Sequence, residues 1–527
     1  MSKKFHVTGN CIQDRHYMVD TGKKIDNITQ DYIDQGCYFT INRARQYGKT
    51  TTLYLLEQNL KDKYIVLSLS FECADEYFKS AQNLVEGLMM DISDSLEAQG
   101  ISPEILKEWN KPVSERFPLR TLGSRITGLC RSCDRKIVLM IDEADKSSDN
   151  QIFLSFLSLL REKYQKQLAG KDCTFYSVIL AGVYDIKNLK LKLHPNEESR
   201  NNSPWNIAAD FRVDMSFSAD EIASMIREYE ADYRTGMDIL QMSQSIYEYT
   251  AGYPYLVSRI CQLIDERVAG SMIYPDKKSA WTAEGFLEAI RILQKEPNAL
   301  FDDMIKQLRE YPKLKKMLEN ILFQGARYTF EADSQMISLG IMFGFLKEKN
   351  NTVIVANRIF ETKLYNFFLS EEESNKKISD ISDNDRNLFI VHGMLQMDLV
   401  MQKFYEYFES VFGKTDDKFI EEEGRRIFLM YLRPIINGTG NYYIEAQTRD
   451  KTRTDVVVDY KGQQFIIELK LWRGPKYHQN GHVQLAEYLE HYHCEKGYLL
   501  SFNFNKNKKT GVTENICNGK RILEVIV

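Results

Sequence analysis

Short apolar runs along the chain alternate with longer segments in which apolar residues recur at every third or fourth position. Runs that are apolar at nearly every position are typical of parallel strands buried on both faces. The intervening spacing is that of amphipathic helices. The apolar runs are 36–42, 64–71, 136–141 and 175–181, and the helical segments between them are 50–61, 81–99 and 152–164. The pattern therefore predicts an α/β domain whose parallel sheet is covered by helices on both faces.

The middle of the chain is predicted to be mainly helical, with helices over 218–232 and 237–266. A helical segment, 334–345, is followed by an alternating segment, 346–354, which turns at Asn350-Asn351. Asn pairs favour tight hairpin turns. The helix and hairpin together resemble a winged helix.

A second α/β pattern follows a polar, acidic segment, Ser370–Arg386, which has the composition of a linker. Helices are expected over 387–412, 417–432 and 482–493, and strands over 442–448, 454–460, 464–469 and 497–504. The predicted organisation is an α/β core over 1–215, a helical and winged-helix region over 216–368, a linker over 369–386 and a second α/β domain over 387–527.

Composition changes this picture little. The chain has 527 residues, of which 43% are hydrophobic and 27% charged, as in an ordinary globular protein of about three to five domains. The net charge of −5 excludes a generally basic chain, so contact with nucleic acid would need local patches. Cys130 and Cys133 form the only C-x-x-C, which favours reduced thiols over a zinc site. No apolar run suits a signal segment or a membrane span, so we expect a cytoplasmic protein without membrane contact.

Gly48-Lys49-Thr50 follows a predicted strand and opens a predicted helix, which is the arrangement of a phosphate-binding loop. Lys49 would reach the β- and γ-phosphates, and the Thr50 hydroxyl would coordinate Mg²⁺. The strand 136–141 runs into Asp142 and Glu143. Asp142 would hold the metal, and Glu143 would act as the general base. The usual loop has a glycine where Arg43 stands.

Residues 42–50 (NRARQYGKT) resemble the R-P-R-R-F-G-K-S loop of the AAA-ATPase-like proteins, which are relatives of the archaeal and STAND-type ATPases. The segments YIVLSLSFE, IDEAD and SPWNIAADFRVDMSFS are also similar to that family, as is Thr250–Pro254, which matches its T-x-G-x-P signature. The resemblance covers residues 5–368 and implies that Arg43 is a family trait. It implies an ATP and Mg²⁺ site formed by Arg43, Arg45, Gln46, Tyr47, Gly48, Lys49, Thr50, Thr51 and Asp142.

Three features near this site stay open. The predicted strand end Leu180–Val183 has no polar side chain to sense a γ-phosphate, which puts rapid hydrolysis in doubt but not binding. Arg212 and Arg259 are candidate sensors, although surface or ion-pair roles are favoured for both. Residues 17–20 (YMVD) either pack against an adenine or belong to the core.

The C-terminal domain contains Asp455 and, at the end of a predicted strand, Glu468-Leu469-Lys470. Alternation along a strand places Glu468 and Lys470 on the same side. A hairpin across Lys461-Gly462 would bring Asp455 to that side. Two carboxylates and the Leu469 carbonyl suit Mg²⁺ or Mn²⁺. Lys470 would orient water, so the chemistry would be metal-assisted phosphodiester hydrolysis.

Residues 387–527, with the order helix, three strands, helix and strand, resemble the PD-(D/E)XK nuclease superfamily. Glu423 is similar to its N-terminal acidic residue, with Glu421 and Glu422 as competitors, and Gln484 is similar to the glutamine of its following helix. Thr454 stands where that family has proline. The alternative is a nuclease fold that has lost its activity and serves in interactions.

Basic and aromatic residues surround this motif, which suits a phosphate backbone and unstacked bases. They are Arg449, Lys451, Arg453, Trp472, Arg473, Lys476, Tyr477, His478 and His482. The spacing of His478, His482, His491 and His493 fits no standard zinc site.

The sequence hypothesis is an ATP-binding module whose nucleotide state gates a metal-dependent nuclease, with genome defence as the setting and DNA favoured over RNA as the partner. The alternatives are a nucleotide switch with a non-catalytic nuclease fold and a DNA-binding ATPase. A homo-oligomer is neither required nor excluded.

Overall fold

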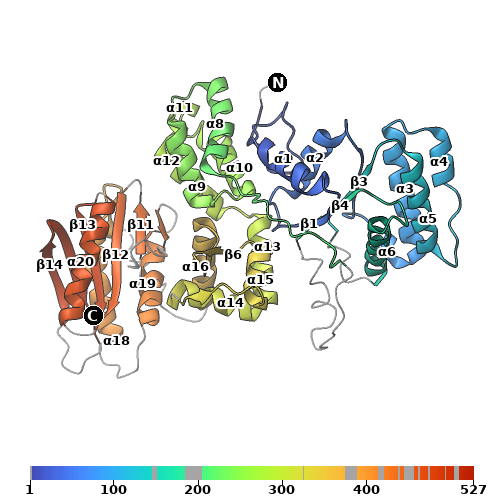
Figure 1. Cartoon of the computed structure of the whole chain (residues 1–527). Helices are drawn as coiled ribbons and strands as arrows, with labels where there is room; N and C mark the ends of the chain where they lie inside the picture. The colour runs from blue at the N-terminus through green and yellow to red at the C-terminus, as the bar shows by residue number, and fades with distance from the viewer. Residues whose placement is uncertain are drawn as a thin grey trace.

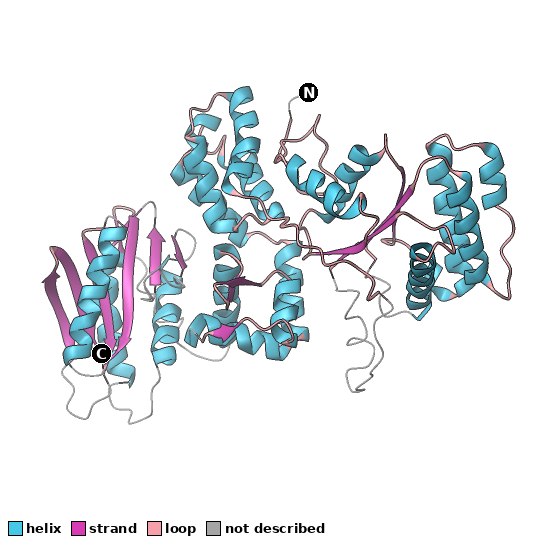
Figure 2. Cartoon of the chain, viewed as in Figure 1, coloured by secondary structure: helices cyan, strands magenta, loops and turns pink. Residues whose placement is uncertain are grey.

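The computed structural model describes residues 3–144, 151–183, 205–324, 326–373, 388–412, 421–436, 440–443, 456–460, 463–472, 475–492, 494–503 and 510–527. The molecule is elongated, with one sheet near the N-terminal side and a second sheet at the C-terminal end (Figures 1 and 2). The helices between α8 and α16 lie between these two sheets. Among the described residues, no helix combines the length and apolar character needed to cross a bilayer.

The N-terminal sheet has four parallel strands in the order β1-β4-β3-β2. They are β1 (Tyr38–Asn42), β2 (Ile65–Ser70), β3 (Ile137–Asp142) and β4 (Ser177–Gly182). Along β3, Ile137 and Leu139 pack on one face, whereas Val138 and Met140 pack on the other. Both faces are therefore covered, and the predicted α/β fold with a parallel sheet is confirmed.

Helices α1 and α2 cover one face of this sheet, and α3, α5 and α6 cover the other. Their bounds are α1 (Gly22–Ile28), α2 (Lys49–Leu60), α3 (Ala81–Ala98), α4 (Pro103–Trp109), α5 (Pro118–Ser132) and α6 (Gln151–Leu168). An isolated parallel bridge between Phe39 and Ala209 extends the sheet beyond β1.

The prediction of one helix over 237–266 is wrong, because the chain turns sharply between two helices there. The helices of this region are α8 (Ala219–Tyr233), α9 (Ile239–Thr250), α10 (Pro254–Leu263), α11 (Lys277–Ala280) and α12 (Ala283–Lys295). Ala251 and Gly252 have positive φ values of 47° and 72°. A Cβ on Gly252 would lie 1.9 Å from the main-chain oxygen of Phe217. Gly252 is therefore required for this turn, and Pro254 can only open the next helix.

The next region combines helices with a small sheet. Its elements are α13 (Ala299–Glu310), α14 (Pro312–Glu319), the π-helical turn η5 (Asn320–Gln324), β5 (Tyr328–Thr329), α15 (Gln335–Met342), β6 (Leu346–Lys349), β7 (Thr352–Val355) and α16 (Arg358–Glu373). The predicted hairpin is present, with left-handed Asn350 and Asn351 at its tip. Helix α16 continues into the predicted linker, and the rest of that linker, from residue 374, lies outside the described residues.

The C-terminal sheet has six strands in the order β10-β11-β12-β13-β15-β14. The elements of this part are β8 (Ile390–Val391), β9 (Met394–Leu395), α18 (Met397–Phe412), α19 (Glu421–Ile436), β10 (Gly440–Tyr443), β11 (Val456–Tyr460), β12 (Gln463–Leu471), α20 (Pro475–His491), β13 (Lys496–Phe502), β14 (Gly511–Cys517) and β15 (Lys520–Ile526). Strands β12, β13 and β15 are parallel, and the other pairs are antiparallel. The sequence did not predict β14 and β15, and the expected helix over 387–412 begins as the β8–β9 hairpin.

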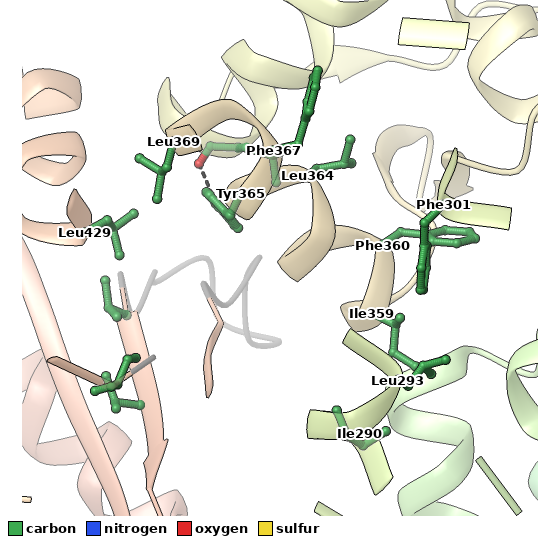
Figure 3. Packing of buried hydrophobic residues seen from close by; sticks show 14 of the residues in the cluster. Ile290, Leu293, Phe301, Ile359, Phe360, Leu364, Tyr365, Phe367, Leu369 and Leu429 are labelled. Carbon is green, nitrogen blue, oxygen red and sulfur yellow. Dashed lines mark hydrogen bonds between the residues drawn. The ribbon is translucent and has the colours of Figure 1, made fainter. Parts of the chain in front are cut away.

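One apolar core joins the middle of the chain to the C-terminal sheet. Leu293 lies beside Ile359 of α16 and Phe301 beside Phe360, and the same buried cluster extends through α16 to Leu429 of α19 (Figure 3). Polar contacts add to it, since the Arg425 guanidinium donates a 2.9 Å hydrogen bond to the main-chain oxygen of Phe323. The C-terminal sheet is therefore packed against the helical region as well as being connected to it through the chain.

The turn at Gly252 generates a prediction about stability. Gly236 is at a left-handed position with open space around it. We expect Gly236→Ala to lower the free energy of unfolding by about 1 kcal/mol. Gly252→Ala should cost at least about twice as much, because its methyl group also meets the Phe217 main chain. Urea unfolding followed by circular dichroism measures both losses. Equal losses would contradict the role given to the Phe217 contact.

Candidate functional site

The loop between β1 and α2 has the backbone of an anion-binding site. Gly48, the residue before α2, has φ of 80°, a conformation that glycine adopts without strain. Helix α2 begins at Lys49, so the amide groups of its first turn point toward the loop. A phosphate placed there would accept hydrogen bonds from these amides and interact favourably with the helix dipole.

Lys49 is almost completely buried, with 6% of its surface exposed. Its ammonium group donates hydrogen bonds of 3.0 Å to the main-chain oxygens of Arg43 and Ala44. These two carbonyls hold the cation above the loop. The ammonium can exchange these partners for phosphate oxygens, because an ionised acceptor forms the stronger hydrogen bond.

The side-chain oxygens of Thr50 and Asp142 lie close together beside this loop. The Thr50 hydroxyl donates a 2.6 Å hydrogen bond to Asp142 Oδ2, at the carboxyl end of β3. Asp142 Oδ1 accepts a 2.9 Å bond from the main-chain N–H of Glu143. A hydroxyl and a carboxylate are hard oxygen donors of the kind that Mg²⁺ prefers, so the pair fits the predicted metal position. Glu143 has φ of 53°, an uncommon value for a residue other than glycine, and such conformations cluster at functional sites.

A cavity of about 710 Å³ opens over these residues. Such a volume suits a small-molecule ligand. The cavity wall includes Lys49, Thr50, Asp142 and Glu143, so the structure brings the predicted catalytic and metal residues of the loop together. It also includes residues that the sequence did not indicate, namely His6, Val7, Gly9, Asn10 and Cys11 of the N-terminal segment and Tyr255 and Ser258 of α10.

The other predicted loop residues take different positions. Arg45, Gln46, Tyr47, Gly48 and Thr51 all line the cavity. The Arg45 guanidinium lies 3.7 Å from Asp303 of α13. Burial raises the pKa of Tyr47 to about 12, so its hydroxyl stays protonated.

The Arg43 side chain points away from the cavity. Its guanidinium donates 2.8 Å hydrogen bonds to the main-chain oxygens of Asn42 and Val213 and lies 5.3 Å from the Phe211 ring centroid. Burial lowers the pKa of this guanidinium from its ordinary value. Arg43 therefore braces the loop against the segment after residue 205 and does not face a ligand directly.

The candidate sensor residues have other contacts. Arg259 makes a two-pronged ion pair with Glu296, with bonds of 2.8 and 2.7 Å. Arg212 is exposed. Strand β4 is buried throughout and has no ionisable side chain at its end. Tyr17 is buried in the core, with its ring centroid 5.0 Å from that of Phe5, and its hydroxyl donates a 2.6 Å hydrogen bond to the exposed Asp232. It also lines the cavity, and its packing against an adenine stays a prediction.

A second polar cluster lies between β12 and α20 of the C-terminal sheet. Glu468 is 3% exposed, and Lys470 lies on the same side of β12, with Lys470 Nζ 3.4 Å from Glu468 Oε1. Lys470 also donates a 2.5 Å hydrogen bond to the side-chain oxygen of Gln484 on α20. The structure thus brings together three of the residues that the sequence singled out. Gly481 of α20 allows this approach, because a Cβ there would lie 3.3 Å from the Lys470 side chain.

A further acidic residue, which the sequence did not indicate, lies on the same face. Glu524 of β15 is in line with Glu468 across the paired strands, through Leu499 of β13. Glu524 Oε2 is 3.3 Å from His482 Nε2 and accepts a 2.8 Å bond from Asn515. The pair His482–Glu524 attaches the first half of α20 to the sheet.

Several predicted residues of this cluster lie outside the described parts of the chain. They are Asp455, Arg449, Lys451, Arg453, Arg473, His493 and the side chains of Glu421, Glu422, Glu423, Lys476, Tyr477, His478 and His491. Strand β11 begins at Val456, which pairs with Ile467. The Leu469 side chain is buried on the opposite side from Glu468. Among the residues with described side chains, no group of three or more His, Cys, Asp or Glu is placed to hold a metal ion.

Residues 9–370 match the profile of the family described as AAA-like domain. Among solved structures, the chain is similar to the Walker-type ATPase PABY2304 of Pyrococcus abyssi, with 13% identity, a TM-score of 0.45 and coverage of 68% of this chain and 99% of that one. It is similar to a RuvB mutant of Thermotoga maritima, with 12% identity, a TM-score of 0.33 and coverage of 63% and 91%. It is also similar to the ORC1 protein of Aeropyrum pernix in complex with DNA, with 11% identity, a TM-score of 0.31 and coverage of 66% and 93%. No curated protein matches it.

The geometry around Thr50 and Asp142 predicts that these two residues contribute to nucleotide affinity only when Mg²⁺ is present. We expect Asp142→Asn and Thr50→Val to weaken binding of a nucleoside triphosphate with Mg²⁺ by about tenfold, which corresponds to loss of one charge-assisted contact. Binding in EDTA should change much less. Titration with a fluorescent nucleotide measures both affinities.

Lys49→Ala should weaken binding under both conditions, because the ammonium acts on the phosphates directly. Lys61→Ala, at an exposed position just after the same helix, serves as the matched control. An Asp142→Asn protein with equal losses with and without Mg²⁺ would contradict the assignment of Asp142 to the metal.

Proposed function

Since the chain belongs to the AAA-like domain family, we propose that it binds ATP with Mg²⁺ and that the bound nucleotide gates a metal-dependent nuclease in its C-terminal sheet. The phosphate-loop geometry supports the first part. The observation that carries the second is the contact of Lys470 with both Glu468 and Gln484 on one face of β12.

The ATP site uses residues that the family match already covers. Thr50 and Asp142 would hold Mg²⁺, which neutralises phosphate charge when bound. Lys49 would bind the β- and γ-phosphates. Glu143 would orient and deprotonate the attacking water, so that hydrolysis ends the active state. The absence of a polar residue at the end of β4 favours slow hydrolysis, as suits a switch.

The nuclease site would use Asp455, Glu468, the Leu469 carbonyl and Glu423 for Mg²⁺ or Mn²⁺, which activates water and stabilises negative charge when bound. The Glu468 carboxylate and the Lys470 ammonium group lie side by side on β12, which is the combination of groups that this chemistry requires. Lys470 would hold the attacking water, and Gln484 fixes the position of the ammonium group.

The proposed substrate is DNA in preference to RNA. Support comes from helices α13–α15 and the β5-β7-β6 sheet, whose order and hairpin resemble those of a winged helix, a fold unit that presents a helix and a wing to a duplex. The basic and aromatic residues around Glu468 and Lys470 would contact the phosphate backbone. Genome defence is the biological setting that we propose for such a nucleotide-gated nuclease.

A second candidate is a nucleotide switch or DNA-binding ATPase whose nuclease-like sheet is not catalytic. The near-complete burial of Glu468 favours it, because a carboxylate that holds a metal ion against a substrate phosphate must be accessible to that metal and substrate.

The proposal predicts cleavage of DNA with Mg²⁺ or Mn²⁺. We expect Lys470→Ala, Glu468→Gln and Asp455→Ala each to reduce the cleavage rate at least about a hundredfold, as for loss of a group that stabilises the transition state. Lys403→Ala, on the half-exposed side of α18, is the matched control. Cleavage that persists in all three variants would overturn the nuclease assignment and leave the ATP site untouched.

The gating part predicts that the cleavage rate depends on nucleotide. Wild-type protein should cleave at different rates without nucleotide, with ATP and with a non-hydrolysable analogue. In Lys49→Ala the three rates should converge, since this variant binds the phosphates more weakly. Gel assays on the same duplex measure all rates, and three distinct rates in Lys49→Ala would contradict gating through the phosphate loop.

A further inference from the structure

The turn between α9 and α10 contacts the phosphate loop directly. Tyr253 is 2% exposed, and its hydroxyl donates a short hydrogen bond to the main-chain oxygen of Arg45. The ring of Tyr253 also packs edge-to-face on Tyr47, with 4.7 Å between the centroids. A change in the path of the loop at residues 45–47 must therefore move Tyr253 or break these contacts.

Four residues earlier, on the last turn of α9, Tyr249 contacts the C-terminal sheet. Its hydroxyl lies 3.4 Å from Asp459 Oδ2, in β11. Asp459 Oδ1 accepts a 3.0 Å hydrogen bond from the Gln464 side chain in β12. Asp459 and Gln464 are also partners in the strand register. Tyr249 therefore contacts the β11–β12 pair, which carries Glu468 and Lys470.

Helix α16 supports both tyrosines. The Arg358 guanidinium, at the start of this helix, lies 5.6 Å from the Tyr249 ring centroid, and the Phe360 ring lies 5.3 Å from that of Tyr253. The turn and the first turn of α16 thus form one packed unit. Close-packed units of this kind transmit displacement instead of absorbing it.

Removing the hydrogen-bond partners of the Asp459 carboxyl would destabilise the fold, because this group is buried. Burial raises the pKa of its carboxyl, while the Gln464 amide, the positive charge of Arg358 and the Tyr249 hydroxyl act in the opposite direction. Loss of the Tyr249 contact would leave a buried carboxylate with fewer partners, and such groups force the structure around them to rearrange. Coupling through this contact requires a second arrangement, in which the tyrosine no longer bonds to Asp459.

Nucleotide binding supplies a reason for the loop to move. Lys49 now binds the carbonyls of Arg43 and Ala44, directly before the Arg45 carbonyl that Tyr253 contacts. Triphosphate would compete for the Lys49 ammonium and release those carbonyls. The Arg45 carbonyl, and with it Tyr253, would then take a new position.

We propose that Tyr249 and Asp459 are positioning residues that connect the phosphate loop to the β11–β12 strands through the Thr250–Pro254 turn. This inference rests on the proposed ATP binding and adds the route by which nucleotide reaches the C-terminal sheet. A ligand shifts such an equilibrium only if it binds the two arrangements with different affinity. The competition for Lys49 is the source of that difference.

Hydrogen–deuterium exchange of the full chain tests this route without requiring nuclease activity. We expect ATP with Mg²⁺ to change the exchange of amides in residues 456–471 at least about twofold, as local opening of the strands becomes easier or harder. In Asp459→Ala and Tyr249→Phe the change should disappear while nucleotide affinity stays within about twofold. Tyr247→Phe, at an exposed position on the same helix, should behave as the wild type.

The outcomes separate this inference from the proposed function. If ATP binds and exchange in residues 456–471 does not respond, or still responds fully in both variants, the route through Tyr249 and Asp459 is wrong. If exchange responds as expected and no nucleic acid is cleaved, the route holds and the nuclease assignment fails. If cleavage is seen, its ATP dependence should be lost in Asp459→Ala, with basal cleavage retained.

Discussion

The phosphate-loop site depends on one hydrogen bond, between Thr50 and Asp142, which connects α2 to β3. It joins the first turn of α2 to the carboxyl end of β3 over 2.6 Å. In a parallel sheet the carboxyl ends of all strands lie at the same edge. The loop after β1 and Asp142 at the end of β3 are therefore close together because of the sheet topology alone. The cavity, the buried Lys49 and the strained Glu143 backbone are all arranged around that edge.

Much of this arrangement could be predicted from the sequence because it is local. Strands β1–β4 are apolar runs that need no distant information, and the triplet Gly48-Lys49-Thr50 marks the start of α2 by itself. In the same way, alternation along β12 was enough to place Glu468 and Lys470 on one face. The match to the AAA-like family confirms the P-loop part of that prediction, whereas the nuclease part stays a proposal.

The features that escaped prediction depend on partners distant in the chain. The Arg43 guanidinium turns away from the cavity because Phe211 and the Val213 carbonyl receive it, and nothing near Arg43 in sequence indicates them. The residues of β14 are mostly polar or small and half-exposed at the sheet edge, so their pattern resembles a loop. The break in the helix before Pro254 did have a local signal, the glycine and proline, which the long apolar periodicity on either side outweighed.

The bond from Tyr17 to Asp232 spans 215 residues of chain, and Tyr17 belongs to the wall of the cavity beside the phosphate loop. During synthesis, the four parallel strands can leave the ribosome and pair while α8 is still untranslated, since domains form from the N-terminus onward. Phe5 and Tyr17 of the N-terminal segment then stay without their packing partner Tyr229 until α8 has left the ribosome. A competent pocket is thus a late product of translation, although its phosphate loop is among the first parts made.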